Sequence, residues 1–139
     1  MTPLAGTMAA TLTGTLTVTL AVALAGGLGA VARFVVDGVV PRHPHGTQLL
    51  TGTLVVNTAG SFLLGLTTAL AARHAIDPDL ARIVGVGFCG GFTTFSTASL
   101  EAVKVWFEDG TGRATAYTLL MVIGSICAAG LGLWTAEVL

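Results

Sequence analysis

The stretch GFCGGFTTFSTASLE, which runs from Gly87 to Glu101, decides the fold of this chain. It lies in an otherwise apolar run, yet it places two adjacent glycines, Gly90 and Gly91, before a phenylalanine that is surrounded by threonine and serine. Glycine and β-branched residues lower helix stability, and serine and threonine hydroxyls offer backbone groups another hydrogen-bond partner. We therefore predict a helix that opens at the glycine pair. A simple kink caused by serine and threonine is the alternative, but the density of unusual residues favours a break.

The composition of the chain predicts that this helix lies in a membrane. Hydrophobic residues make up 53% of the 139 residues and charged residues only 9%, and the mean hydropathy is +0.87. An ordinary soluble domain has about 25% charged residues, so this surface is suited to lipid rather than to water. The net charge is −1 and basic residues form no cluster, which excludes nucleic acid as a partner. The 19 glycines lie mostly within the apolar runs, where they favour close contact between helices.

Four windows without charge divide the chain into four membrane-spanning helices. They cover residues 1–32, 43–72, 83–100 and 114–136, and a spanning helix needs about 20 apolar residues. We place the helices at about residues 16–39, 49–73, 83–107 and 114–136, in one domain that covers residues 16–139. Residues 1–15 are expected to form a loose tail rich in threonine and alanine, and residues 41–46 a turn. Basic residues flank the two sides of the membrane almost equally, so the sequence allows insertion in either orientation or in both. A single orientation with a small charge bias is the alternative, and it is the usual case for a four-helix protein.

A break within the third helix is a candidate ion site. Irregular backbone at membrane depth persists only where it is buried in protein or lines a cavity, and exposed carbonyl oxygens there suit a hard monovalent cation. The hydroxyls of Ser96 and Thr97 and the positive ring edge of Phe95 are, in contrast, donors toward an anion. Such a patch lowers the dehydration cost of a small anion without a full charge that would trap it.

Two further stretches carry polar residues that lipid does not favour. In GTLVVNTAGSFLLG, residues 52–65, the side chains of Thr53, Asn57 and Ser61 recur every four residues and form one helical stripe. An interhelical hydrogen bond and a polar track are both open interpretations of that stripe. In GGLGAVAR, residues 26–33, small residues predict a packing face, and Arg33 can pair with Asp37 or extend to water.

The ends of the third helix and the face of the fourth add the remaining candidates. Glu101 and Lys104 are spaced for an ion pair near the membrane boundary. Tyr117, Met121 and Ser125 share one face of the fourth helix. The sequence contains no serine–histidine–carboxylate set, phosphate loop or metal-binding helix motif, so we do not expect an enzyme.

In their order along the chain, the three motifs resemble those of the fluoride channel family, Fluc or CrcB. The likeness rests on residues 26–33, on VN and GSF within residues 52–65, and above all on GGFTTFST within residues 87–101. Two residues depart from the family pattern, because Ala98 stands where a second phenylalanine is usual and Met121 where a hydroxyl is usual. Phe92 or Phe62 is expected to fill the space of the missing ring.

The resemblance implies an all-α membrane protein that assembles as an antiparallel, dual-topology homodimer with two fluoride pathways along the subunit interface. It also implies a structural sodium ion at the dimer centre, held by the main-chain carbonyls of Gly90 and Thr93, and charged family positions at Arg33 and Glu101. The implied fluoride pathway contains Asn57, Phe95, Ser96, Thr97, Tyr117 and Ser125.

The implied function is passive, fluoride-selective export of cytoplasmic fluoride across the inner membrane of the cell, which lowers fluoride toxicity. Two other classes stay open from the residues. A small proton-coupled antiporter of the multidrug type needs a carboxylate within the membrane, and Glu101, toward the end of the third helix, is poorly placed for it. A packing subunit that transports nothing would need only the glycine surplus.

Overall fold

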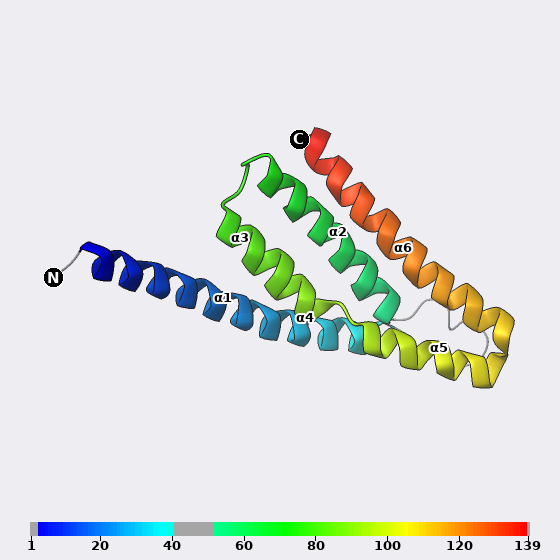
Figure 1. Ribbon diagram of the computed structural model, residues 1–139. Coiled ribbons are helices and arrows are strands. Elements are labelled where there is room, and N and C mark those ends of the chain that lie inside the picture. The colour runs from blue at the N-terminus through cyan, green and yellow to red at the C-terminus, as the bar shows by residue number, and fades with distance from the viewer. Residues whose placement is uncertain (1–2, 41–51, 139) are drawn as a thin grey trace.

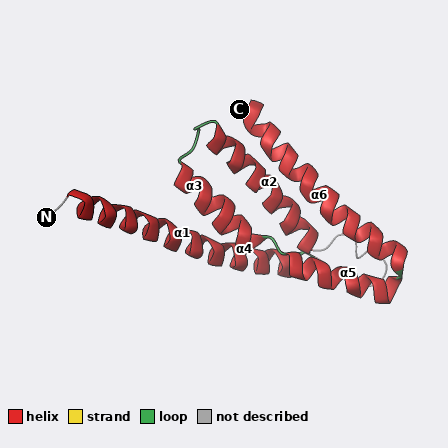
Figure 2. Ribbon diagram, viewed as in Figure 1, coloured by secondary structure: helices red, strands yellow, loops and turns green. Residues whose placement is uncertain are grey.

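The computed structural model describes residues 3–40 and 52–138, and these residues form helices joined by short turns (Figure 2). The helices are α1 (Pro3–Val39), α2 (Gly52–Ala72), α3 (Pro78–Arg82), the π-helix η1 (Ile83–Cys89), α4 (Gly90–Phe92), α5 (Phe95–Asp109) and α6 (Thr111–Val138). The segment from α3 to α5 is one interrupted span, so the described residues contain four spans long and apolar enough to cross a membrane. The prediction of four spans is confirmed.

Helix α1 begins earlier than the sequence predicted. It runs from Pro3, so the loose tail expected over residues 1–15 is wrong for residues 3–15. The physical reason is that the threonines satisfy their own hydroxyls within the helix: Thr11 and Thr15 each donate to the carbonyl one turn earlier, at 2.9 Å. With the hydroxyls bonded in this way, threonine continues an apolar helix without leaving a polar group unpaired.

The break in the third span lies after the glycine pair and not at it. Gly90 and Gly91 are both helical, within α4, and the backbone becomes extended at Thr93 (φ −78°, ψ 159°) and Thr94 (φ −149°, ψ 123°). Thr94 then begins α5, because its hydroxyl accepts a hydrogen bond from the Thr97 N–H. The predicted break is confirmed, but its position is set by a threonine cap rather than by glycine flexibility.

Glycines instead allow the helices to approach one another closely. A methyl group on Gly91 would overlap the Gly26 carbonyl of α1, and one on Gly29 would overlap the Phe88 carbonyl. The predicted packing face of residues 26–33 is therefore correct. The same arrangement joins α2 to α6, where Gly132 lies directly against the Phe62 carbonyl.

The other helix ends differ little from the predicted ones. The third span covers residues 78–109 and α6 covers residues 111–138, so each is a few residues longer than expected. Asp77 caps α3 by accepting from the Asp79 and Leu80 N–H groups, and Gly110, at φ 86°, makes the turn into α6. The predicted turn at residues 41–46 and the predicted start of the second helix at residue 49 lie outside the described residues.

The arrangement of helices leaves much of the molecule open. In Figure 1, α2 lies between the third span and α6, while α1 runs along η1 and α4 and extends beyond them toward its N-terminus. The buried cluster is small and consists of Leu54, Ala98, Tyr117 and Met121. It lies where α2, α5 and α6 meet, next to the break in the third span, and so it supports the polar residues described next.

Candidate functional site

Asn57 connects helix α2 to the break in the third span. Its side chain is buried, with 8% exposed, and its Oδ1 accepts from the Thr94 N–H at 2.7 Å while its Nδ2 donates to the Thr94 carbonyl at 3.0 Å. Nδ2 also lies 3.5 Å from the Met121 sulfur, which is a weak acceptor. The side chain of Asn57 thus replaces the helical partner that the Thr94 N–H loses at the break and adds a bond to the Thr94 carbonyl.

This exchange of partners affects two backbone carbonyls. In a continuous α-helix, the Thr94 N–H would donate to Gly90 and the Thr97 N–H to Thr93. Here the Thr94 N–H donates to Asn57 and the Thr97 N–H to the Thr94 hydroxyl. The carbonyls of Gly90 and Thr93 are therefore released from those helical bonds, and both residues line the same cavity. These are the two residues at which the family resemblance places sodium ligands, and carbonyl oxygen is a suitable ligand for a hard cation.

Hydroxyls gather at the first turn of α5. The Thr94 hydroxyl donates to the Thr97 hydroxyl at 3.1 Å and lies 3.3 Å from the Ser96 hydroxyl. Phe95, between them, is 88% exposed. Thr94, Ser96 and Thr97 therefore form one connected group, whereas the Phe95 ring makes little contact with the rest of the described chain.

Glu101 lies about one turn after Thr97 on α5 and accepts two hydrogen bonds from other helices. Thr53 of α2 donates to its Oε1 at 2.9 Å, and Tyr117 of α6, whose side chain is 1% exposed, donates to its Oε2. Lys104 pairs with Glu108 instead, at 3.9 Å, so the predicted Glu101–Lys104 ion pair is wrong. The reason is that the hydroxyls of the neighbouring helices reach the carboxylate from the interior side.

A large cavity of about 880 Å³ opens along α2, the third span and α6. Its lining includes most of the predicted pathway, namely Asn57, Phe95, Tyr117 and Ser125. Ser61, the last member of the predicted stripe on α2, lines it as well. The prediction that the residues of this stripe face protein or a cavity rather than lipid is therefore correct.

Arg33 lines a second, smaller cavity of about 190 Å³ between α1, α2 and the first turn of α5. Asp37, Thr53 and Thr97 line it too. The Arg33 Nε is buried and has no hydrogen-bond partner among the described residues. Thr94 lines both cavities. The Asn57–Thr94 connection therefore lies between the small cavity, which contains the Arg33 guanidinium, and the large cavity.

No second phenylalanine ring stands in the space of the missing ring among the described residues, and Ala98, Tyr117 and Met121 line the large cavity there. Ala98 is buried against Leu54, Tyr117 and Met121. Neither Phe92 nor Phe62 is among the residues that line the large cavity, and the ring of Phe92 stacks on Phe88 at 5.5 Å between centroids. The expectation that one of these two rings fills the space is not met within a single subunit.

Sequence reasoning missed the central role of Thr94 and the partners of Glu101. Thr94 is an N-cap, and the signal that identifies it is a threonine placed just before a helical segment with an amphipathic pattern. The bonds from Thr53 and Tyr117 cross between helices. No spacing within one helix reveals such bonds.

Comparison with known proteins adds independent information. Residues 20–133 match a family model described as CrcB-like protein, Camphor Resistance (CrcB). The fluoride-specific ion channel FluC 1 of Leifsonia xyli subsp. xyli is 51% identical over 110 residues, which cover 78% of this chain and 79% of that protein. FluC 2 of Cutibacterium acnes is 46% identical over 109 residues, covering 78% and 88%. FluC of Gloeobacter violaceus is 38% identical over 114 residues, covering 82% and 91%.

Proposed function

The chain belongs to the CrcB family, and because its relatives are fluoride-specific ion channels, we propose that it is a fluoride channel through which cytoplasmic fluoride leaves the cell passively. Passive flow needs no second substrate and no chemical step. The direction of net flow then follows the electrochemical gradient of fluoride, and export would lower fluoride toxicity. As a multi-pass membrane protein, it would act in the inner membrane of the cell.

The observation that carries the proposal is the Asn57–Thr94 connection between the two cavities. The hydrogen-bond donors at this connection are neutral: the Asn57 amide and the hydroxyls of Ser96 and Thr97. The second N–H of the Asn57 amide faces only the Met121 thioether at 3.5 Å, and a fluoride ion is a far stronger acceptor. Neutral donors suit an ion that must be released again, since conduction requires binding that is favourable but weak.

Two charged groups would act at the ends of this path. The Arg33 Nε, which has no hydrogen-bond partner among the described residues, lines the smaller cavity together with Asp37 and would attract anions toward Asn57. Glu101 is held by Thr53 and Tyr117, and its charge would keep those two hydroxyls oriented toward the carboxylate. Ser125, further along the large cavity, would offer the next hydroxyl on α6.

We further propose that the working unit is an antiparallel, dual-topology homodimer. The large cavity is open along one face, and the Phe95 ring on its edge is 88% exposed although ring edges are the anion-attracting groups of the implied pathway. A second copy on this face would close the cavity into two pathways. The near-equal distribution of arginines supports insertion in both orientations.

The carbonyls of Gly90 and Thr93 fit the sodium site that the family resemblance implies. Both lose their usual helical partners at the break, and both residues lie on the open cavity. Two copies together would supply four such oxygens. A bound sodium ion would neutralise the partial negative charges of these carbonyls at the subunit interface.

Fluoride efflux from liposomes tests the proposal. Purified protein, reconstituted in vesicles loaded with potassium fluoride and followed with a fluoride electrode, should release fluoride once valinomycin lets potassium leave with it, and a matched chloride-loaded sample should retain chloride. Release should fall at least tenfold when sodium is replaced by N-methylglucamine on both sides of the membrane, because the proposed carbonyl site is then left without its ion. Absence of release from samples that contain intact dimers would refute the channel.

The alternative of a proton-coupled antiporter has less support. Its carboxylate would be Glu101, which is already engaged by two hydroxyls. Fluoride release that stops when the pH gradient is removed, and that Glu101→Gln abolishes, would favour the antiporter. A packing subunit would show no release under any condition.

A further inference from the structure

A wedge-shaped cavity of about 490 Å³ lies between α1 and the start of the third span, apart from the two cavities described above. It is lined by Gly14, Thr15, Val18, Thr19, Val22, Asp79, Arg82 and Val86. At its inner end the helices are in close contact, because a methyl group on Gly87 would come within 2.7 Å of the Val22 carbonyl oxygen. From there α1 and α3 separate toward the N-terminus of α3, as Figure 1 shows.

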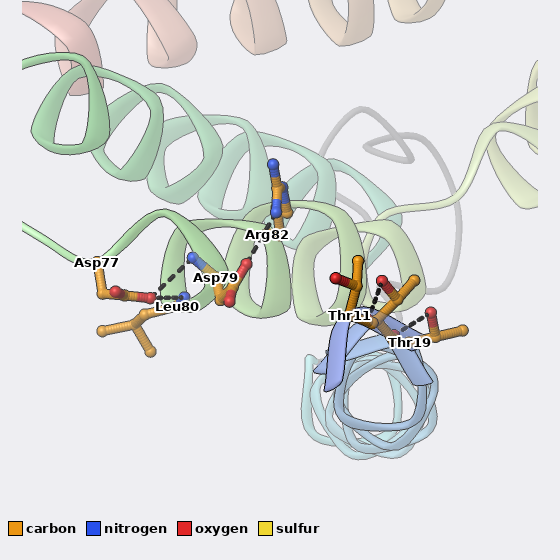
Figure 3. A network of polar contacts seen from close by, with 7 residues as sticks. Thr11, Thr19, Asp77, Asp79, Leu80 and Arg82 are labelled. Carbon is orange, nitrogen blue, oxygen red and sulfur yellow. Dashed lines mark hydrogen bonds and ion pairs between the residues drawn. The ribbon is translucent and has the colours of Figure 1, made fainter. Parts of the chain in front are cut away.

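The walls of the wedge are apolar even where the sequence contains threonine. The hydroxyls of Thr15 and Thr19 donate to carbonyls of their own helix at 2.9 and 2.8 Å, as Figure 3 shows for Thr19. These threonines therefore contribute mainly methyl groups to the wall of the wedge, next to Val18 and Val22. A wall of this kind suits an acyl chain.

The mouth of the wedge carries one negative and one positive group. Asp79 and Arg82 of α3 form an ion pair at 2.8 Å (Figure 3). The neighbouring Asp77 is not among the residues that line the wedge, and its Oδ1 accepts from the N–H groups of Asp79 and Leu80. The pair follows directly after the turn between α2 and α3, where the chain of a membrane protein returns to the polar boundary of the bilayer.

From these three observations we infer that the wedge binds one zwitterionic phospholipid with an amine in its headgroup. The acyl chain occupies the apolar walls, the phosphate contacts Arg82 and the headgroup ammonium contacts Asp79. The paired charges at the mouth match the paired charges of such a headgroup, whereas an anionic lipid would leave Asp79 facing negative charge. Lipid is the occupant because the apolar walls lie on two membrane-spanning segments and the charged mouth lies next to the turn at the end of one of them.

Native mass spectrometry of the purified dimer with equal amounts of phosphatidylethanolamine and phosphatidylglycerol of the same acyl chains tests the site. We expect one retained phosphatidylethanolamine per chain and at least fivefold less phosphatidylglycerol. Val18→Trp, which fills the wedge, and Arg82→Gln should each reduce the retained phosphatidylethanolamine at least fivefold. Asp79→Asn, which leaves the arginine alone, should reverse the preference in favour of phosphatidylglycerol.

The chain offers a matched control for each substitution. Val31 is an exposed valine of α1 outside the wedge, and Arg113 forms an ion pair with Asp109 at 3.0 Å elsewhere on the surface. Val31→Trp and Arg113→Gln should retain the lipid within twofold of the unchanged protein, and fluoride efflux of all five variants should be preserved. Equal retention of both lipids by the unchanged protein would overturn the inference. So would equal lipid loss in the control variants, or a wedge without lipid because a second copy occupies it.

Discussion

Asn57 is the residue that holds the break of the third span in place. Its amide oxygen accepts from the Thr94 N–H, which would otherwise be buried without a partner, and its NH2 group adds a hydrogen bond to the Thr94 carbonyl. A buried polar group that loses its partner costs about 1–3 kcal/mol. The amide is thus needed for the shape of the pathway as well as for contact with the ion.

We therefore predict that Asn57→Ala lowers both stability and conduction. The free energy of unfolding should fall by about 1–3 kcal/mol, since the buried Thr94 N–H loses its partner, and fluoride efflux should fall at least a hundredfold. Thermal unfolding in detergent and liposome efflux measure the two effects. Thr68→Ala on the same helix is the control, because the Thr68 hydroxyl bonds only to the Leu64 carbonyl of its own helix. Equal behaviour of the two variants would contradict this role of Asn57.

The carboxylate of Glu101 allows a test of coupling between helices. Tyr117→Phe and Thr53→Val each remove one hydrogen bond, and bonds to a charged acceptor contribute about 1.5–3 kcal/mol. Because both hydroxyls serve one carboxylate, the double variant should deviate from the sum of the single variants by about 0.5–3 kcal/mol. Thermal unfolding of the four proteins of this double-mutant cycle measures the deviation. Strict additivity would mean that the two hydroxyls act independently.

At this scale the sequence reveals positions but not partners. The four-residue spacing of Thr53, Asn57 and Ser61 was enough to predict a polar stripe. That Thr53 meets Glu101, and that Asn57 meets the backbone of Thr94, depends on the register between helices. Register is set by packing across the bundle, which spacing along one helix does not contain.

At the scale of the helices, close contact through glycine is what fixes that register. Helices α2 and α6 approach where Gly65 lies against the Ala129 backbone and Gly132 against the Phe62 carbonyl. Nothing lies within 4 Å of a methyl group placed on Gly130, only two residues away. Neighbouring glycines in one helix therefore have different roles.

We predict that Gly132→Ala destabilises the protein and that Gly130→Ala does not. The added methyl group at residue 132 forces the two helices apart, which costs about 1–3 kcal/mol. At residue 130 the same change removes backbone freedom from the unfolded chain and stabilises by about 0.4–1 kcal/mol, provided that nothing else covers that surface. Thermal unfolding of the two variants compares them directly. A similar loss of stability in both would show that Gly130 is covered in the assembled protein.

The position of the helix break shows where helix-level prediction succeeds and where it fails. The density of glycine, threonine and serine between residues 87 and 101 was sufficient to predict that the helix is interrupted. It was not sufficient to predict which residue interrupts it, because glycine tolerates both helix and break. Gly91 is helical because α1 packs closely on it, and Thr94 leaves the helix because Asn57 binds its backbone.

For the whole molecule, the even number of spans determines how two copies can be joined. Four spans place both ends of the chain on the same side of the membrane, so two antiparallel copies have their ends on opposite sides.

We predict that two copies fused through a linker with one additional transmembrane helix conduct fluoride like the unfused protein. A fusion through a flexible soluble linker forces the parallel arrangement and should lose efflux within each fused molecule.

Liposome efflux at a protein density of less than one fused molecule per vesicle measures this difference, because at that density two fused molecules do not meet. Size-exclusion chromatography checks that both fusions contain intact protein. Conduction by the flexible fusion alone would mean that the working dimer is parallel.

The length of α1 has a consequence for the lipid around the protein. Its 37 residues extend about 55 Å, while the 21 residues of α2 extend about 32 Å, and α1 has no charged residue before Arg33. Hydrocarbon of about 30 Å matches α2 but is too thin for α1, and a helix in hydrophobic mismatch responds by tilting. Bilayer thickness would then set the inclination of α1 and, through it, the width of the gap to α3, so a thicker membrane would draw the two helices together.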